Sequence, residues 1–369
     1  MRTHTRFDMA TLGLSALMLR ALPEASQPAS LRRKLRAYSA SENRLWLRTL
    51  GRRFYADSPL KLDVERTRAQ GARLAASPHR LTEAERERFL DDGYLRPFRV
   101  IPEDEARALG QRVSERAREP GVYGFASPRD LHLADAQVRQ LLREPAIVDR
   151  LAQLMGADLG VWRSELFAKE PGDGAIMTHH ATVYRFEDRL PVLQPDESAG
   201  LFQLTVWVAL SDARVDNGCM YVIPGTHREP VTFRKGGESR FYGFDAVVPD
   251  PPIPTPPVPI ELAAGEAFIF SERVLHGSYA NSSARRRVAL NARVIRSDVR
   301  VHADKATHFA QHHGATFDLS AWGVWPLAGT YRRRYNRRRI FADDAPSQTR
   351  ENRASDQDLR QVATKTSSS

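Results

Sequence analysis

The stretch Ile176-Met-Thr-His-His-Ala-Thr-Val-Tyr184 carries the feature on which the interpretation of this chain depends. A histidine followed two positions later by a carboxylate, with a second histidine roughly a hundred residues downstream, is how a jelly-roll barrel presents three protein ligands to Fe(II). His179 is the first histidine of this pattern, and His276, 97 residues further on, is the candidate for the second. The carboxylate is missing, because Ala181 occupies its position. The sequence therefore predicts an iron site with two protein ligands.

The periodicity around this stretch predicts helices first and short strands afterwards. Thr82 is a candidate N-cap, with Glu85 as its capping-box partner. Several short strands separated by turn residues indicate a barrel or a sandwich, not a doubly wound sheet. Residues 228–258 form a long insertion, and its proline cluster at residues 249–259 is expected to be a lid or a solvated loop, because proline does not fit a central strand. We expect helices at 82–89, 102–118, 134–143 and 144–155, and strands at 159–168, 201–210, 219–223, 260–262, 267–270, 277–280 and 288–295.

The net positive charge of this 369-residue chain is concentrated near its N-terminus. Residues 1–80 hold 16 Lys/Arg against 6 Asp/Glu, so they account for the whole net charge of +10. This basic helical extension is a candidate for binding an acidic partner, although solvated helix faces explain the same composition. Nucleic-acid binding is not expected, because no basic-aromatic motif of a known module is present. The polar end, residues 341–369, is predicted to be disordered.

Hydropathy and cysteine content predict a cytoplasmic protein without a membrane span. No apolar run approaches the roughly 20 residues that cross a bilayer. The single cysteine, Cys219, excludes a framework of intrachain disulfides and fits a reducing compartment.

Each site residue also has a purely structural interpretation. A histidine such as His179, taken alone, is more often a hydrogen-bonded core residue than a ligand. His227 competes as a metal ligand but lacks a partner at the required spacing, and His312 and His313 are expected at the surface. The site interpretation is favoured by the combination of the two histidines with an arginine 11 residues after His276, at Arg287. Arg285 and Arg286 leave the register of that arginine open.

Several segments together resemble the phytanoyl-CoA dioxygenase superfamily over residues 82–340. Within the superfamily, the sequence is most similar to the non-haem iron halogenases of the syringomycin type, which share the His-x-Ala pattern. The segments that carry the resemblance are Phe89–Tyr94, Val161–Phe167, Pro171–Asp173, Leu204–Trp207, Asn217–His227, Phe241–Asp245, Val299–His302, Trp322–Val324 and Tyr335–Arg337.

The resemblance implies a fold that is mainly β with flanking helices, a double-stranded β-helix (jelly-roll, cupin-like) barrel at residues 81–340. It implies Fe(II), 2-oxoglutarate, chloride and O2 as cofactors, with His179 and His276 on iron and chloride beside Ala181. Arg287, helped by Trp207, would bind 2-oxoglutarate. Thr205 and Arg293 would order the surroundings of the halide. The substrate would be a small molecule or an amino acid tethered to a carrier protein.

Two departures from the family pattern keep alternatives open. His180 stands where the family more often has glutamine, and Phe186 stands where the family example has an asparagine of the halide shell. One alternative is a hydroxylase or oxygenase of the same fold that recruits Glu187 or Asp188 as the third ligand. The other is a catalytically degenerate barrel that serves as a binding protein.

Overall fold

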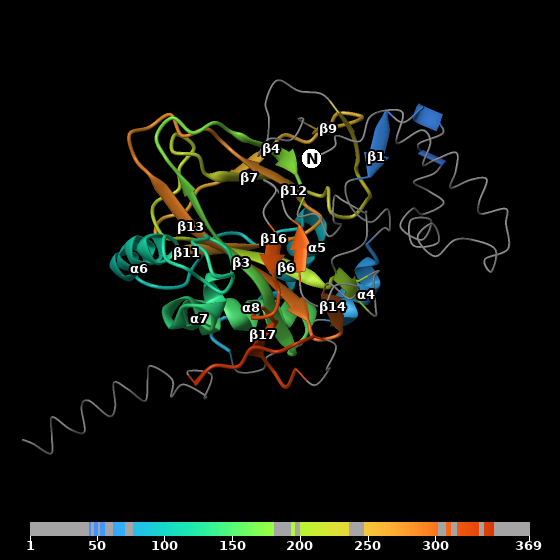
Figure 1. Cartoon of the computed structure of the whole chain (residues 1–369). Helices are drawn as coiled ribbons and strands as arrows, with labels where there is room; N and C mark the ends of the chain where they lie inside the picture. Colours follow the sequence, from blue (N-terminus) through green and yellow to red (C-terminus); the bar gives the residue numbers. More distant parts are fainter. Residues whose placement is uncertain are drawn as a thin grey trace, which may run out of the picture. The chain divides into compact units, whose positions relative to one another are not determined.

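The computed structural model describes residues 44–45, 48–50, 52–55, 62–70, 77–180, 193–195, 200–235, 247–301, 308–310, 316–331 and 336–342. Residues 1–338 and 339–369 form two compact units, and every labelled element in Figure 1 belongs to the first. Some sequence predictions therefore lie outside the described residues: the surroundings of Ala181, Phe186, Glu187, Asp188, His312 and His313, and the tail from residue 343 onward. None of the helices in the described part combines the length and the hydropathy that a membrane span requires.

A six-stranded antiparallel sheet forms one face of the barrel, in the order β17-β3-β13-β6-β11-β2 (Figure 1). All seven residues of its central strand β6 are buried, as expected for a strand covered on both faces. The bounds are β2 (Phe98–Arg99), β3 (Leu159–Lys169), β6 (Gln203–Ala209), β11 (Glu266–Ser271), β13 (Arg287–Arg296) and β17 (Trp325–Ala328).

A four-stranded antiparallel sheet, in the order β10-β7-β12-β4, faces the first. Trp207 and Phe268 of the larger sheet share one buried apolar cluster with Val222 and Ile260 of the smaller sheet. The core therefore lies between the two sheets, and the predicted mainly β fold with flanking helices is confirmed. The bounds are β4 (Ile176–His179), β7 (Met220–Ile223), β10 (Val258–Ile260) and β12 (Leu275–Ser278).

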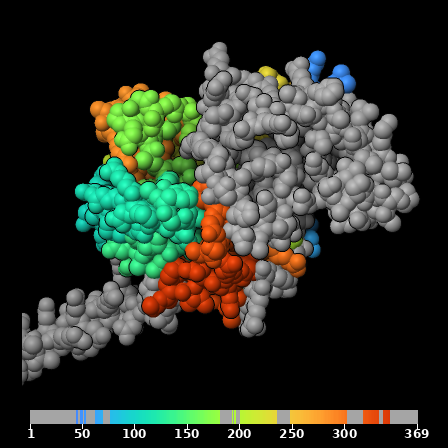
Figure 2. All heavy atoms as spheres, in the orientation of Figure 1, coloured from blue at the N-terminus to red at the C-terminus, as the bar shows by residue number. Residues whose placement is uncertain are grey.

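The helices precede most of the barrel in sequence (Figure 1), and α8 and η2 contact β6 and β3 of the larger sheet, while α4 contacts α8. Thr82 caps its helix as predicted, because its hydroxyl accepts from the amide of Glu85 and the Glu85 carboxylate accepts from the amide of Thr82. In Figure 2 the helical segment (teal) forms a continuous surface on the side that is drawn. The bounds are α4 (Val64–Gln70), α5 (Glu83–Asp92), α6 (Glu103–Arg116), η2 (Leu131–Leu133), α7 (Ala136–Leu142) and α8 (Pro145–Met155).

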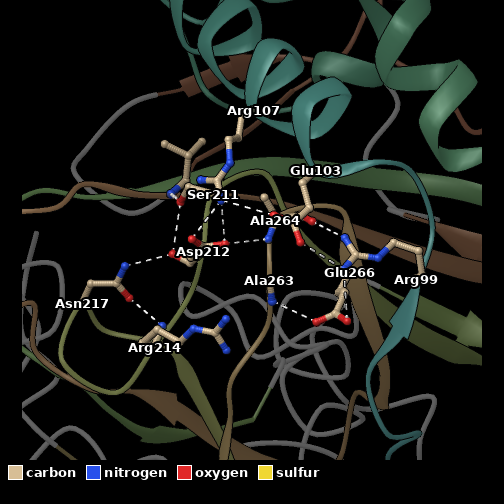
Figure 3. A network of polar contacts seen from close by, with 11 residues as sticks. Arg99, Glu103, Arg107, Ser211, Asp212, Arg214, Asn217, Ala263, Ala264 and Glu266 are labelled. Atoms are coloured by element: carbon tan, nitrogen blue, oxygen red, sulfur yellow. Dashed lines mark hydrogen bonds and ion pairs between the residues drawn. The ribbon is translucent and has the colours of Figure 1, made fainter.

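Polar contacts around Asp212 join the helical layer to the barrel (Figure 3). The Asp212 carboxylate accepts two hydrogen bonds from Arg107 of α6, at 3.0 and 2.9 Å, and one from the amide of Ala264. Its backbone carbonyl accepts from the side chain of Asn217, whose own carbonyl oxygen accepts from the amide of Arg214. Asp212 thereby contacts α6 and the residue Ala264 before β11 through its carboxylate, and Asn217 through its backbone carbonyl.

The insertion at residues 228–258 contains strands, and the expectation of a solvated loop for its proline cluster is confirmed for residues 250–257, which lie outside any strand and are mostly exposed. The strands β8 (Thr232–Lys235) and β9 (Val247–Pro249) form a three-stranded sheet with β1 (Arg53–Tyr55) from the basic extension, in the order β1-β8-β9. Pro249 and Pro259 lie in β9 and β10, which are both edge strands, where a missing amide costs no ladder hydrogen bond. Two smaller pairs complete the fold: β5 (Leu193–Pro195) with β14 (Val299–Val301), and β15 (His308–Ala310) with β16 (Thr316–Asp318).

Gly277 allows β12 and β4 to approach each other. A Cβ at this position would lie 2.6 Å from the carbonyl oxygen of Ile176 in β4 and would also overlap the hydroxyl of Tyr221. We therefore expect Gly277→Ala to lower the free energy of unfolding by about 1–3 kcal/mol, as overpacking does. Denaturant unfolding monitored by circular dichroism measures this change. Gly174→Ala, where a Cβ meets nothing within 4 Å, is the control and should unfold like the parent; equal stability of the two variants would contradict the expectation.

Candidate metal centre

Two neighbouring strands of the smaller sheet bring the predicted histidines together. His179 is the last residue of β4 and lies directly opposite His276 of β12 in the antiparallel register. Their imidazole centroids are 4.5 Å apart, with the ring planes inclined at 55°. A separation of 97 residues in sequence thus becomes a contact between two side chains.

The backbone fixes the orientation of both rings. The Nδ1 of His179 lies 2.8 Å from the carbonyl oxygen of Met177, and the Nδ1 of His276 lies 2.9 Å from that of Val274. A carbonyl oxygen can only accept, so each Nδ1 carries the proton and each Nε2 carries a lone pair. This is the arrangement in which histidine ligates a metal, with its second nitrogen held by an outer partner.

Burial keeps both imidazoles neutral. Desolvation lowers the pKa of His179 and places the pKa of His276 well below the ordinary value. The positive charge of Arg293 lowers both pKa values further. Phe270 closes one side of the centre, with its ring 4.9 Å from that of His276. Neutral imidazoles are the form that binds a metal ion, so the site is prepared for one at neutral pH.

The donor set fits Fe(II). Imidazole nitrogen is a ligand that suits iron as well as zinc and copper. No group of three or more His, Cys, Asp or Glu side chains able to hold a metal occurs in the part of the chain that the structure describes. Within that part the centre therefore offers two protein donors and leaves the remaining positions to other ligands.

The structure shows which of the three consecutive arginines, 285 to 287, lies inside the barrel. Arg285 and Arg286 are surface residues that pair with Asp216 and Glu170. Arg287 is only 2 % exposed, and its Cζ lies 5.4 Å from the centre of the Trp207 ring. Of these three arginines, Arg287 is the one placed inside the barrel beside Trp207.

The two residues predicted near a halide are cross-strand neighbours. Thr205 of β6 lies opposite Arg293 of β13. The hydroxyl of Thr205 is buried without a hydrogen-bond partner, so a polar group is available inside the barrel. Burial and the neighbouring Arg163 lower the pKa of Arg293 to about 10.

His227 and His180 have structural roles in the part of the chain that the structure describes. His227 lies 3.0 Å from the carbonyl oxygen of Leu90 through its Nε2 and packs beneath Gly93, which ends α5 at a φ of 85°. It therefore joins the helical layer to the barrel. His180 is buried edge-on against Phe233 of β8, with ring centroids 5.2 Å apart.

Sequence reasoning missed a group of charged residues deeper in the barrel. Arg163 and Glu165 of β3 lie opposite Arg293 and Asn291 of β13. Charged residues at alternate positions of an otherwise apolar strand were the signal that could have indicated them, because alternate side chains point to one face.

Comparison with known proteins then gives the family. The sequence profile described as Phytanoyl-CoA dioxygenase (PhyH) matches residues 89–289, more than half of the chain. The chain belongs to the phytanoyl-CoA dioxygenase family. The superfamily expected from the sequence is thereby confirmed, whereas its halogenating branch is not distinguished.

Named relatives of this family member are dioxygenases and hydroxylases. The phytanoyl-CoA dioxygenase of Arabidopsis thaliana is 30% identical over 144 residues, which cover 37% of this chain and 45% of that protein. The L-proline trans-4-hydroxylase of Streptomyces griseoviridis is 27% identical over 234 residues, 55% of this chain and 82% of that protein. This chain therefore spans less than half the length of the plant relative.

A solved structure supports the fold. CytC3 with Fe(II) and alpha-ketoglutarate superposes with a TM-score of 0.57 at 23% identity, over 71% of this chain and 94% of that one. The double-stranded β-helix predicted for this family member is confirmed.

Removing either histidine should abolish metal binding. We expect His179→Ala and His276→Ala each to weaken binding of Fe(II) by more than about 100-fold, since loss of an outer-sphere partner alone costs about 10–100-fold. Anaerobic calorimetric titration of the full chain measures the affinity. His79→Ala, a half-buried histidine outside the centre, should leave it unchanged. Retention of parental affinity in either site variant would place the metal elsewhere.

Proposed function

We propose that this chain is a Fe(II)- and 2-oxoglutarate-dependent enzyme that oxidises an unactivated C–H bond of a small molecule. The observation that carries the proposal is the pair of facing imidazoles, His179 and His276, each with its Nδ1 on a backbone carbonyl. The named dioxygenase and hydroxylase relatives support the same class of reaction.

Each residue of the proposed site has a separate role. His179 and His276 hold the iron through their Nε2 atoms. Arg287 binds the distal carboxylate of 2-oxoglutarate, because a planar guanidinium matches a carboxylate with two parallel hydrogen bonds. Trp207 lies beneath that guanidinium and fixes its direction. Iron and 2-oxoglutarate, when bound, supply the oxidising power, while Phe270 and Trp207 keep the centre apolar around them.

The role of Arg287 can be tested separately from that of the metal. Arg287→Gln should weaken binding of 2-oxoglutarate by at least about 30-fold, since losing one partner of a buried charge pair costs about 2–5 kcal/mol. The absorption band that depends on Fe(II) and 2-oxoglutarate reports the affinity, and succinate release reports turnover. Arg285→Gln, which removes a surface arginine, is the matched control. Absence of the band from the parent chain would favour a binding barrel without catalysis.

Within this class, Ala181 favours transfer of a halogen over hydroxylation. Replacing the carboxylate by a methyl group removes a negative charge and one ligand, and chloride can fill both roles. Thr205 and Arg293 supply a buried hydroxyl and a positive charge near the histidines. Hydroxylation, the reaction named for several relatives, is the competing outcome and would require a carboxylate such as Glu187 or Asp188 on the metal.

Chloride binding tests the halogenase proposal without knowledge of the substrate. We expect chloride to shift the absorption band of the parent chain loaded with Fe(II) and 2-oxoglutarate, and the shift to disappear in Ala181→Asp, whose carboxylate takes the vacant position. Ala181→Gly, which keeps the position free, should respond as the parent does. An unchanged band at high chloride in the parent would favour hydroxylation.

For the substrate and the partner, only a chemical class is proposed. A small molecule or an amino acid tethered to a carrier protein would meet the requirement for an unactivated C–H bond. The basic extension at residues 1–80 would suit an acidic partner of this kind.

A further inference from the structure

A β-bulge gathers buried arginines on the inner face of the larger sheet. The pairing of β13 with β3 passes from Arg293 opposite Arg163 to Val294 opposite Val161, so Trp162 is the extra residue. A bulge changes the direction of its side chains and occurs often near binding sites. Here it places Trp162 on the inner face, where its Nε1 donates to the side chain of Gln203 at 2.7 Å.

Two guanidiniums share the Trp162 ring. The Cζ of Arg163 lies 4.8 Å from the ring centroid, and that of Arg293 lies 5.8 Å from it. Cations over an indole face are attracted to its quadrupole, which partly compensates for their burial. Burial nevertheless lowers the pKa of both arginines, so holding both positive charges here costs free energy.

Arg129 adds a third positive charge. Its Cζ lies 5.0 Å from the ring centroid of Phe317, and its side chain is only 12% exposed. Its Nη2 donates to Glu165 over a long 3.5 Å, whereas its Nη1 is buried without a hydrogen-bond partner. A buried guanidinium with an unused donor is costly and points to a ligand that accepts from it.

Two carboxyl groups lie in the described part of this cluster. Glu165 contacts Arg129, and Asp130 is fully buried with hydrogen bonds from the Tyr123 hydroxyl and the Ser164 amide. Burial raises the pKa of Asp130, which reduces its negative charge. Of these two carboxyl groups, Glu165 accepts from Arg129 only over 3.5 Å, and the Nη1 of Arg129 keeps a donor for a further acceptor.

The cluster adjoins the metal centre. Arg293 of β13 lies opposite Thr205 of β6, Thr205 lies opposite Phe270 of β11, and the ring of Phe270 is 4.9 Å from that of His276. The hydroxyl of Thr205 and the side-chain oxygen of Asn291 are buried on the same face without partners. A ligand held by Arg129 would therefore extend past polar groups toward the iron.

We propose that Arg129 binds a free carboxylate of the substrate and orients its C–H bond toward the metal centre, a proposal that rests on the proposed function. A carboxylate accepts from the unused Nη1 donor of Arg129 in the planar geometry that a guanidinium matches. The aromatic rings of Tyr123, Phe125 and Phe317, which contact one another beside Arg129, suit an apolar body. An aminoacyl thioester has no free α-carboxylate, so the proposal favours a free acid over an amino acid bound to a carrier through that group.

The experiment compares acids with their amides. Small aliphatic and aromatic carboxylic acids, including the L-amino acids, are each paired with the corresponding primary amide. Binding is measured by saturation-transfer NMR on the full chain saturated with Zn(II) and 2-oxoglutarate, so that Arg287 is already occupied. At least one acid should bind at least about tenfold more tightly than its amide, as expected for a charged hydrogen bond.

Variants assign that preference to Arg129. Arg129→Gln should remove it without lowering the melting temperature, and Arg129→Lys should restore part of it. Arg150→Gln removes an arginine stacked on Phe98, 4.2 Å from the ring centroid, and is the matched control. The proposal would be overturned if acids and amides bound equally or if no acid bound. An acid preference that survives in Arg129→Gln would overturn it as well. Acid binding without succinate release would instead reject the proposed function alone.

Discussion

The candidate site depends on the register between β4 and β12. A shift of one residue would turn one histidine to the opposite face of the sheet, because side chains alternate along a strand. The same backbone also supplies the carbonyl groups that hold each Nδ1. Position and tautomer are therefore both set by main-chain geometry, and the small residue Gly277 permits the close approach that this geometry needs.

A second constraint is the distance between the two arginines that β13 places inside the barrel. Arg287 and Arg293 are six residues apart, an even number, so they point to the same face. At about 3.3 Å per residue, their Cα atoms are separated by roughly 20 Å. One small anion cannot contact both, which separates the guanidinium of Arg287 beside Trp207, where the proposed function puts the carboxylate of 2-oxoglutarate, from the charged cluster around Trp162.

The sequence predicted those features that depend on local patterns. The helix α8, the strands β3 and β13, and the cap at Thr82 followed from periodicity and turn residues. The histidine pair followed from spacing. The domain boundaries near residues 80 and 340 and the chemical roles of the site residues remain predictions.

Features that depend on tertiary contacts could not be predicted. The strands β8 and β9 of the insertion pair with each other, and β8 also pairs with β1 across a long separation in sequence. Three consecutive arginines, Arg285 to Arg287, look alike in sequence, and only burial distinguishes them. The bulge at Trp162 and the place of Arg129 depend on how neighbouring strands pack, which no local pattern encodes.

The pairing of β1 with β8 has a consequence for biosynthesis. Phe54 lies opposite Phe233, which is synthesised 179 residues later. At about 5–20 residues per second, the first strand waits roughly 10–35 s on the ribosome before its partner emerges. Meanwhile its backbone groups are open to pairing with other chains, and the basic residues that surround it would keep nascent copies apart by repulsion.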